Sequence, residues 1–270
     1  MGAIAGVLGQ IMEFLYNFVQ NYGVAIFLFT LIVRIILLPL NIKQQKSMIK
    51  MQKINPLLTE LQTKYKNDKE KQNQETMKLY KKYKISPMSG CFPMLIQFPI
   101  LIALIWVIYD PGWYMFHIDT AKEIAAHPEI YEGMSTQLAK LQVAVNSGLN
   151  AKIFGINLVA IPDFKAVSEL WIFPLVATGL TYLSGKITQG QQPSQAANDQ
   201  AAQTGKMMTT IFPLMTLFFT FTMPVAASFY WTISSAFQIL QTLALKKLIK
   251  VDDIELDNGG TWHERNGKKR

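Results

Sequence analysis

The sequence contains little charge, and its charges are unevenly distributed. Of its 270 residues, 50% are hydrophobic and only 16% are charged. No charged residue occurs among the 25 residues between Lys84 and Asp110, or among the 39 residues between Lys206 and Lys246. An uncharged apolar stretch of this length is typical of a membrane-spanning helix, because about 20 helical residues cross a hydrocarbon core of about 30 Å. These continuous runs exclude a soluble globule and a disordered chain as first interpretations, and they disfavour an alternating membrane β-barrel.

Reactive and metal-binding side chains are also scarce. Cys91 is the single cysteine and cannot form an intramolecular disulfide, and the three histidines are too isolated to predict a metal site. The sequence contains no Ser-His-Asp set, no HExxH pair and no glycine-rich phosphate loop. We therefore expect no catalytic residue, no metal and no cofactor, and the chain is not predicted to be an enzyme.

The apolar stretches predict an all-α membrane protein with five transmembrane helices. The predicted spans are residues 22–42, 91–109, 170–188, 207–223 and 225–245. Pro224 divides the 39-residue uncharged stretch into two spans that form a tight hairpin, since proline suits the first turn of a helix. A single helix over all 39 residues would be nearly twice as long as the bilayer core, at about 1.5 Å per residue.

The distribution of lysines predicts the orientation of the spans. Residues 43–84 contain twelve lysines and four acids, whereas residues 110–169 contain four lysines and seven acids. Because basic loops remain in the cytoplasm, residues 43–84 are predicted to be cytoplasmic and residues 110–169 external. The N-terminus is then external, and the loop 189–206 and the basic tail 246–270 are cytoplasmic. This predicts a multi-pass membrane protein.

Two further helical segments are predicted outside the spans. Residues 1–21 contain Gly2, Gly6, Gly9, Glu13 and Asn17, and apolar residues recur at helical spacing, which favours an amphipathic helix on the external membrane surface over a sixth span. No basic segment precedes these apolar residues, as it would in a secretory signal peptide. Two alternatives stay open: the chain is made without a cleaved signal peptide, or the signal peptide was removed before residue 1.

Residues 43–84 have the pattern of two antiparallel helices joined at Asn67-Asp68. A first apolar seam follows the spacing of a coiled coil, and a second, weaker seam follows the turn. Pro56 either kinks the first helix or begins it afresh. The seams are Met51, Ile54, Leu58, Leu61 and Tyr65, and then Met77, Tyr80 and Tyr83.

The lysines of this hairpin allow two interpretations. One is a solvated helix face that also fixes topology. The other is a docking surface for anionic partners such as lipid headgroups, ribosomal RNA or acidic chain segments. No aromatic or arginine pattern indicates recognition of a specific nucleic-acid sequence. The candidate docking residues are Lys64, Lys66, Lys69 and Lys71.

Arg34 is the one formal charge in the interior of a predicted span, since Lys186 lies near the end of the span 170–188. A charge there is costly in hydrocarbon unless it faces water or reaches the interface by snorkelling, and both interpretations are open. No span contains a carboxylate that could pair with it. Polar residues follow one face of several other spans, which by itself is commonly explained by hydrogen bonds between helices. Together with Arg34 they favour a hydrophilic cavity, whose candidate lining residues are Thr30, Gln97, Thr178, Thr181, Trp231, Ser234 and Gln238.

Three stretches resemble the YidC/Oxa/Alb family of membrane protein insertases. They are "ISPMSGCFPMLIQFPILIALIWVI" (85–108), "FTLIVRIILLPLNIKQQKSMIKMQKINP" (29–56) and "MPVAASFYWTISSAFQILQ" (223–241). The resemblance covers nearly the whole chain, and its Gly-Cys-x-Pro…Gln-x-Pro stretch is the most specific part. The chain lacks a lipid-attachment cysteine and a large external domain, so the resemblance is to the five-span, Gram-positive or clostridial type.

The resemblance implies a five-helix core around a groove that opens to the cytoplasm and laterally to lipid. Arg34 matches the family's groove arginine, and Thr30, Gln97 and Trp231 match groove or substrate-contact positions. The implied function is that of an insertase and chaperone for nascent membrane proteins. The implied partners are those proteins, membrane lipids, the ribosome and the Sec translocon. "FGINL" (154–158) also resembles a family loop, but its sequence indicates no mechanism.

Two other classes of function compete with an insertase. A small-solute anion transporter or channel could use Arg34 as its anion site, although the two halves of the sequence show no internal repeat. A structural scaffold of a membrane complex would need the lysine hairpin alone, and the polar stripes within the spans disfavour it.

Overall fold

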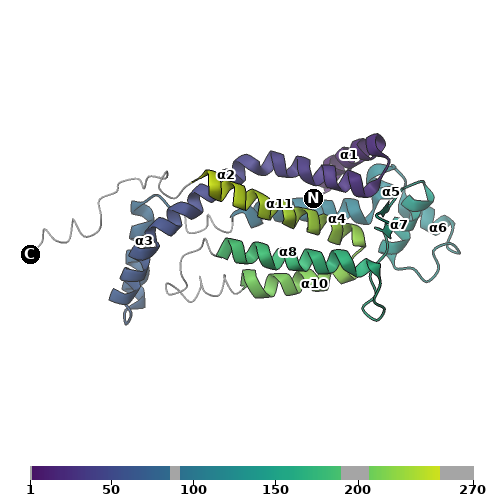
Figure 1. Cartoon of the computed structure of the whole chain (residues 1–270). Helices are drawn as coiled ribbons and strands as arrows, with labels where there is room; N and C mark the ends of the chain where they lie inside the picture. The colour runs from purple at the N-terminus through teal and green to yellow at the C-terminus, as the bar shows by residue number, and fades with distance from the viewer. Residues whose placement is uncertain (1, 86–91, 190–206, 250–270) are drawn as a thin grey trace, which may run out of the picture. The chain divides into compact units, whose positions relative to one another are not determined.

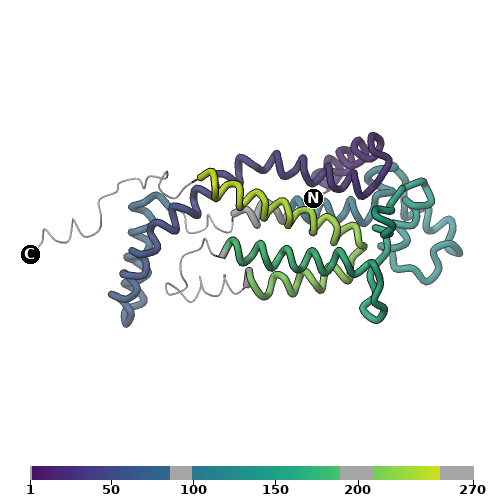
Figure 2. Tube along the Cα trace, viewed as in Figure 1, coloured from purple at the N-terminus to yellow at the C-terminus, as the bar shows by residue number. Residues whose placement is uncertain are grey.

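The computed structural model describes residues 2–85, 92–189 and 207–249, and in helical positions 92–98, 189 and 207–208 it describes the backbone alone. Figures 1 and 2 show the course of the chain. It divides into two compact units. The first comprises Met1–Leu37, Met94–Tyr182 and Phe212–Gln238, and the second comprises Leu38–Pro93, Leu183–Ile211 and Ile239–Arg270. Most of the predicted loop 189–206 and tail 246–270 lies outside the described residues.

The first unit is mainly helical and contains most of the charge-poor segments. Its hydrophobic core joins residues from many elements, and Tyr22, Phe29, Leu104, Leu141 and Val225 are all buried in it. The elements that contribute wholly or in part are α1 (Gly2–Val19), α2 (Tyr22–Lys64), α4 (Phe92–Tyr109), α5 (Pro111–Met115), α6 (Thr120–Ala126), α7 (Thr136–Asn146), β1 (Lys152–Ile153), β2 (Ile156–Asn157), η2 (Glu169–Trp171), α8 (Ile172–Gln189), α10 (Phe212–Thr222) and α11 (Val225–Leu248).

The chain breaks between α10 and α11 as predicted. A five-residue π-helix, η3 (Met207–Ile211), precedes α10, which ends at Thr222, and α11 begins at Val225 directly after Pro224. The alternative of a single helix over residues 207–245 is therefore wrong. Proline cannot donate a backbone hydrogen bond and restricts the residue before it, so Pro224 favours a fresh helix start.

The second unit contains the rest of α2 and the helix α3 (Lys69–Lys82), which form the predicted hairpin. Asp68 caps α3 by accepting a hydrogen bond from the Lys71 backbone N–H at 3.0 Å, so the turn lies at Asn67-Asp68 as predicted. The 43-residue helix α2 continues through Pro39 and Pro56. Pro56 therefore does not begin a new helix.

The hairpin core confirms the first apolar seam and corrects the second. Ile54, Leu58 and Leu61 are buried with Leu79 and Tyr83 in one cluster. Met77, which the sequence pattern assigned to the seam, is 48% exposed. The helical face that points inward runs through residues 76, 79 and 83, and position 77 lies about 100° from position 76 around the helix.

Composition and length mark three described helical segments as able to cross a membrane: Gly2–Val19, Tyr22–Lys64 and Glu169–Thr188. Pro99–Tyr109 and Thr209–Thr222 are shorter apolar helices. Two strands of two residues each are the only strands within the described ranges. The expected all-α membrane fold is confirmed. The count of five spans and the interfacial position of residues 1–21 stay predictions, because α1 is also long and apolar enough to span.

Candidate substrate-binding site around Arg34

Arg34 of α2 hydrogen-bonds to two residues of α11. Its Nη1 donates to Gln238 Oε1 at 2.5 Å, and its Nη2 donates to the Ser234 carbonyl at 2.8 Å and to Ser234 Oγ at 2.6 Å. Residues 234 and 238 are four apart, so they lie on one face of α11. Three residues that the sequence analysis grouped by their polarity thus meet, and we refer to them as the Arg34 site.

The Arg34 site retains a net positive charge. Within the described part of the chain, every hydrogen-bond partner of Arg34 is a neutral group. Guanidinium carries five N–H donors, and three hydrogen bonds leave two donors for water or a bound segment. Arg34 is partly exposed in the absence of a membrane. The arrangement holds one oriented positive charge without a counter-charge, so it attracts anionic groups and supplies no nucleophile or general base.

The other predicted lining residues differ in where they lie. Thr30 is 1% exposed, and its hydroxyl donates to the Ile26 carbonyl at 2.7 Å, so it reaches no open surface here. Trp231 is partly exposed. Gln97 lies in α4, but its side chain is outside the described residues. Their contacts with a substrate stay predictions.

Thr178 and Thr181 of α8 both hydrogen-bond to their own helix, and Thr181 also contacts α11. Thr178 Oγ1 donates to the Pro174 carbonyl at 2.8 Å, and Thr181 Oγ1 donates to the Ala177 carbonyl at 2.7 Å. Thr181 Oγ1 also lies 3.4 Å from Ser235 Oγ of α11. The two helices run side by side in Figure 1. Both hydroxyls therefore satisfy backbone carbonyls of α8, and that of Thr181 also links α8 to α11, as threonines in apolar helices commonly do.

α11 also has a second polar face, which was not predicted from the sequence. Thr232 Oγ1 donates to the Phe173 carbonyl of α8 at 3.2 Å, and the Phe173 and Phe229 rings pack edge to face at 5.0 Å. Thr232 and Ser235 are three residues apart, a spacing that could have indicated a helix contact. α11 thus presents Ser234 and Gln238 to Arg34, and Thr232 and Ser235 to α8.

The four candidate docking residues of the hairpin surround the turn between α2 and α3. We call Lys64, Lys66, Lys69 and Lys71 the turn lysines, and all four are exposed. The ammonium groups of Lys64 and Lys71 lie 5.6 and 5.7 Å from the centre of the Tyr65 ring, within cation–π distance. Farther along α3, the Glu75 carboxylate accepts a hydrogen bond from Lys78 and raises the pKa of that lysine. The turn lysines form a solvent-facing cationic surface.

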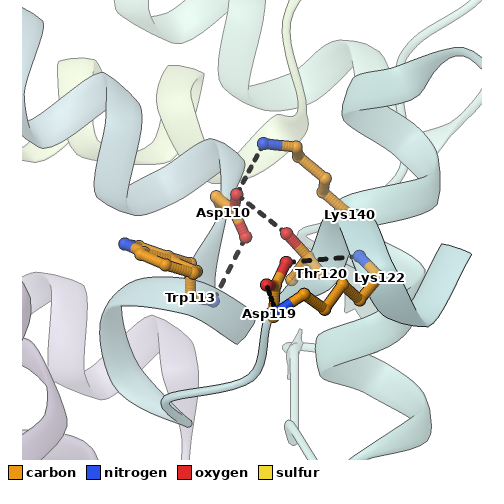
Figure 3. A network of polar contacts seen from close by, with 6 residues as sticks. All are labelled: Asp110, Trp113, Asp119, Thr120, Lys122 and Lys140. Atoms are coloured by element: carbon orange, nitrogen blue, oxygen red, sulfur yellow. Dashed lines mark hydrogen bonds and ion pairs between the residues drawn. The ribbon is translucent and has the colours of Figure 1, made fainter.

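An ion pair between buried Asp110 and partly exposed Lys140 organises the segment that follows α4 (Figure 3). Asp110, 8% exposed, accepts hydrogen bonds from Lys140 Nζ at 2.7 Å, Thr120 Oγ1 at 3.1 Å and the Trp113 backbone N–H at 3.2 Å. Nearby, Asp119 caps α6, and its hydrogen bond from Lys122 lowers the pKa of its carboxyl group. Asp110 therefore ties α5, α6 and α7 to the end of α4.

Comparisons with known proteins identify the family. The sequence model of the family described as "60Kd inner membrane protein" matches residues 14–253. A Clostridium perfringens protein named membrane protein insertase YidC is 34% identical over 248 residues, covering 88% of this chain and 88% of its own. The chain belongs to the YidC family. A YidC of Caldanaerobacter subterraneus is also 34% identical, and the match covers 89% of this chain and 93% of that protein.

A solved structure agrees with the YidC assignment. The structure titled "Active YidC insertase crystal structure with the first transmembrane domain resolved" matches with a TM-score of 0.56 and 25% sequence identity. The match covers 90% of this chain and 46% of that chain, so this chain spans less than half the length of that YidC. The helical fold is therefore that of a YidC core. The recognition made from the three sequence stretches is confirmed.

Proposed function

We propose that this membrane protein insertase captures hydrophilic segments of nascent membrane proteins at the Arg34 site and releases their hydrophobic segments laterally into the bilayer. The observation that carries the proposal is the hydrogen bonding of Arg34 by neutral groups alone among the described residues. An intramembrane arginine that is not neutralised needs a wet environment, because hydrocarbon would make its charge too costly. We therefore propose a water-filled groove at this depth, lined also by Gln97 and Trp231, whereas Thr30 is buried behind it.

A groove of this kind lowers the barrier to insertion without chemistry. The hydrophilic segment of a substrate crosses a shorter apolar path when water reaches partway into the membrane. Arg34 attracts acidic residues in that segment with two free donors and its charge. Burial of the hydrophobic segment in lipid contributes about 25 cal/mol per Å² of apolar area removed from water. This scheme includes no covalent step, nucleotide or metal.

The contacts of α1 support the proposal that residues 1–21 lie on the external surface. A Cβ on Gly9 would lie 2.8 Å from the Tyr114 carbonyl, and His117 Nε2 lies 3.1 Å from Glu13 Oε2. α1 thus packs lengthwise against the segment that follows α4, which we propose is external. Its opposite face exposes Phe14 and Phe18, which are 72% and 82% exposed, and lipid is the natural cover for this face.

The proposed location is the bacterial plasma membrane, with the N-terminus outside and the C-terminus in the cytoplasm. The lysine-rich hairpin is then cytoplasmic, and the turn lysines are accessible to the ribosome, the Sec translocon or anionic headgroups. Their exposure supports a docking role.

Reconstitution of the purified protein in liposomes tests the proposed function. A small single-span substrate with an acidic translocated segment is synthesised in the presence of proteoliposomes or of protein-free liposomes, and protease protection reports insertion. We expect insertion by the proteoliposomes without any other protein. Insertion equal to that of protein-free liposomes, together with anion uptake by the proteoliposomes, would instead support the anion transporter.

A further inference from the structure

Phe154 combines two features that are individually unfavourable for a phenylalanine. It is 86% exposed, and its φ is +50°, in the left-handed region. With Gly155 at φ +81°, it forms the two-residue turn between β1 and β2. Turns with two positive φ values favour Asn-Gly or Asp-Gly, and bulky side chains are outliers there. Neither the local backbone nor burial in the protein explains a phenylalanine at this position.

The hairpin that carries Phe154 is fixed to the beginning of α2. The Tyr22 backbone N–H donates to the Asn150 carbonyl at 2.9 Å, and Asn21 Nδ2 donates to the Lys152 carbonyl at 3.0 Å. A Cβ on Gly23 would lie 2.7 Å from Ile153 Cδ1, so β1 lies directly against the first turn of α2.

The same hairpin is fixed to the beginning of α11. The Ala226 N–H donates to the Leu158 carbonyl at 2.7 Å, and the Val225 N–H donates to the Ala160 carbonyl at 2.9 Å. These are N–H groups of the first helical turn, which have no partner within the helix. The chain that follows β2 thus caps α11 while β1 contacts α2. The turn is held at the level where two apolar helices begin.

The two strands sort their side chains by polarity. Ile153 pairs with Ile156, which is buried, whereas Lys152 pairs with Asn157 and both are exposed. Ile153 and Ile156 therefore anchor the hairpin to the protein. Phe154 at its tip projects away from that core, with a cation two residues before it.

We propose that the tip of the β1–β2 hairpin, Phe154 with Lys152, is a membrane anchor that inserts in the lipid interface where α2 and α11 begin. This inference rests on the proposed spanning of those two helices. Lipid is the occupant that the position favours, because the start of a spanning helix lies at the boundary between headgroups and acyl chains. There, an aromatic ring enters the apolar layer and a lysine reaches phosphate groups. The rigid backbone keeps the ring at one depth.

Depth-dependent fluorescence quenching tests the anchor. In a Cys91→Ser background, an environment-sensitive fluorophore is attached at Phe154→Cys or, as a matched control, at Glu129→Cys, whose native side chain is 69% exposed. Proteoliposomes contain lipids spin-labelled near the headgroup. We expect several-fold stronger quenching by the lipid label at 154 than at 129, and the reverse with aqueous iodide. Equal accessibility of both positions to iodide, without lipid quenching at 154, would overturn the proposal.

A second variant separates anchoring from folding. Phe154→Asn suits the positive φ, so the hairpin should fold at least as well as in the parent, while the apolar ring is lost. A fluorophore at Lys152→Cys should be quenched by the lipid label several-fold less in Phe154→Asn than with Phe154 present. Unchanged quenching would contradict the anchor. Insertion activity of the same proteoliposomes is measured separately, so an absent anchor in active vesicles leaves the proposed insertase mechanism standing.

Discussion

At the scale of single residues, the structure gives Arg34 a bonding role that its sequence does not predict. A guanidinium in a span could snorkel to the surface or face a cavity, and sequence alone leaves both open. Instead, Arg34 bridges α2 to α11 through Ser234 and Gln238 and keeps its charge. It therefore has two separable roles, a link between helices and a source of positive potential.

Substitution of Arg34 by lysine separates these roles. Arg34→Lys keeps the charge but cannot form the same fork of hydrogen bonds. We expect it to insert acidic-tail substrates within a few-fold of the parent rate while its melting temperature in detergent falls. Gln238→Leu is the matched control, because it removes one hydrogen bond, worth about 1 kcal/mol, and leaves the arginine. If Arg34→Lys slowed the insertion of acidic-tail substrates as much as Arg34→Ala, the geometry of the hydrogen bonds, and not the charge, would drive capture.

At the scale of elements, the hairpin joins a defined apolar core to an exposed cationic turn. Ile54, Leu58 and Leu79 hold its two helices together, whereas the turn lysines are exposed. The charge of the turn can therefore be altered without unfolding the hairpin.

Neutralising the turn lysines to glutamine should weaken binding to ribosomes in salt titrations. If each lysine contacts one phosphate, the slope of log affinity against log salt falls in magnitude by roughly 3. Neutralising Lys78, Lys81 and Lys84, which are also exposed, is the control and should change the slope less. Equal effects of the two sets would indicate a diffuse field, and no effect of either would leave the lysines a purely topogenic role.

The ion pair of Figure 3 should contribute to the stability of the segment after α4. Lys140→Met keeps the apolar stem but leaves the buried Asp110 carboxylate without its ion pair. We expect a loss of about 1–3 kcal/mol of stability, since Lys140 is partly exposed and Thr120 still donates to Asp110. Thermal denaturation in detergent measures it. The double variant Asp110→Asn with Lys140→Met should recover part of the loss, and no recovery would place the defect in packing around Lys140.

Sequence periodicity predicted where helices begin and end better than it predicted which helix face is buried. Uncharged length and Pro224 located the α10–α11 break, and the 3,4 spacing located the first seam of the hairpin, because both depend on neighbours along the chain. Met77 was wrongly assigned to the inner face of α3. Residues three and four positions before Tyr83 both have helical spacing, so the pattern through Tyr80 could not be distinguished from the true face one residue earlier. Thr30 and Thr181 could not be told apart from cavity-lining residues, because a hydroxyl that bonds its own helix has the same spacing. The pattern of polar and apolar residues does not predict the turn at Phe154 or its positive φ.

At the scale of the whole molecule, the account depends on which side of the membrane each loop lies. Cysteine labelling in a Cys91→Ser background should find position 71 accessible only from the cytoplasm and position 129 only from outside. A reagent that cannot cross the membrane, applied to intact cells and to inverted vesicles, makes this measurement. Position 195, outside the described residues, should behave like position 71. Labelling of position 71 from outside would overturn the orientation or the number of spans.

The central claim is that the charge of Arg34 captures acidic segments, and the most direct test varies the acids of the substrate. Single-span substrates with none, one, two or three acidic residues in the translocated segment are inserted into proteoliposomes of the parent or of Arg34→Ala. In a wet groove each acid near the guanidinium gains about 1 kcal/mol, roughly a fivefold change in rate. We expect the ratio of parent to variant rates to be near one without acids and to rise with the first acid. A ratio that is independent of the number of acids would contradict it.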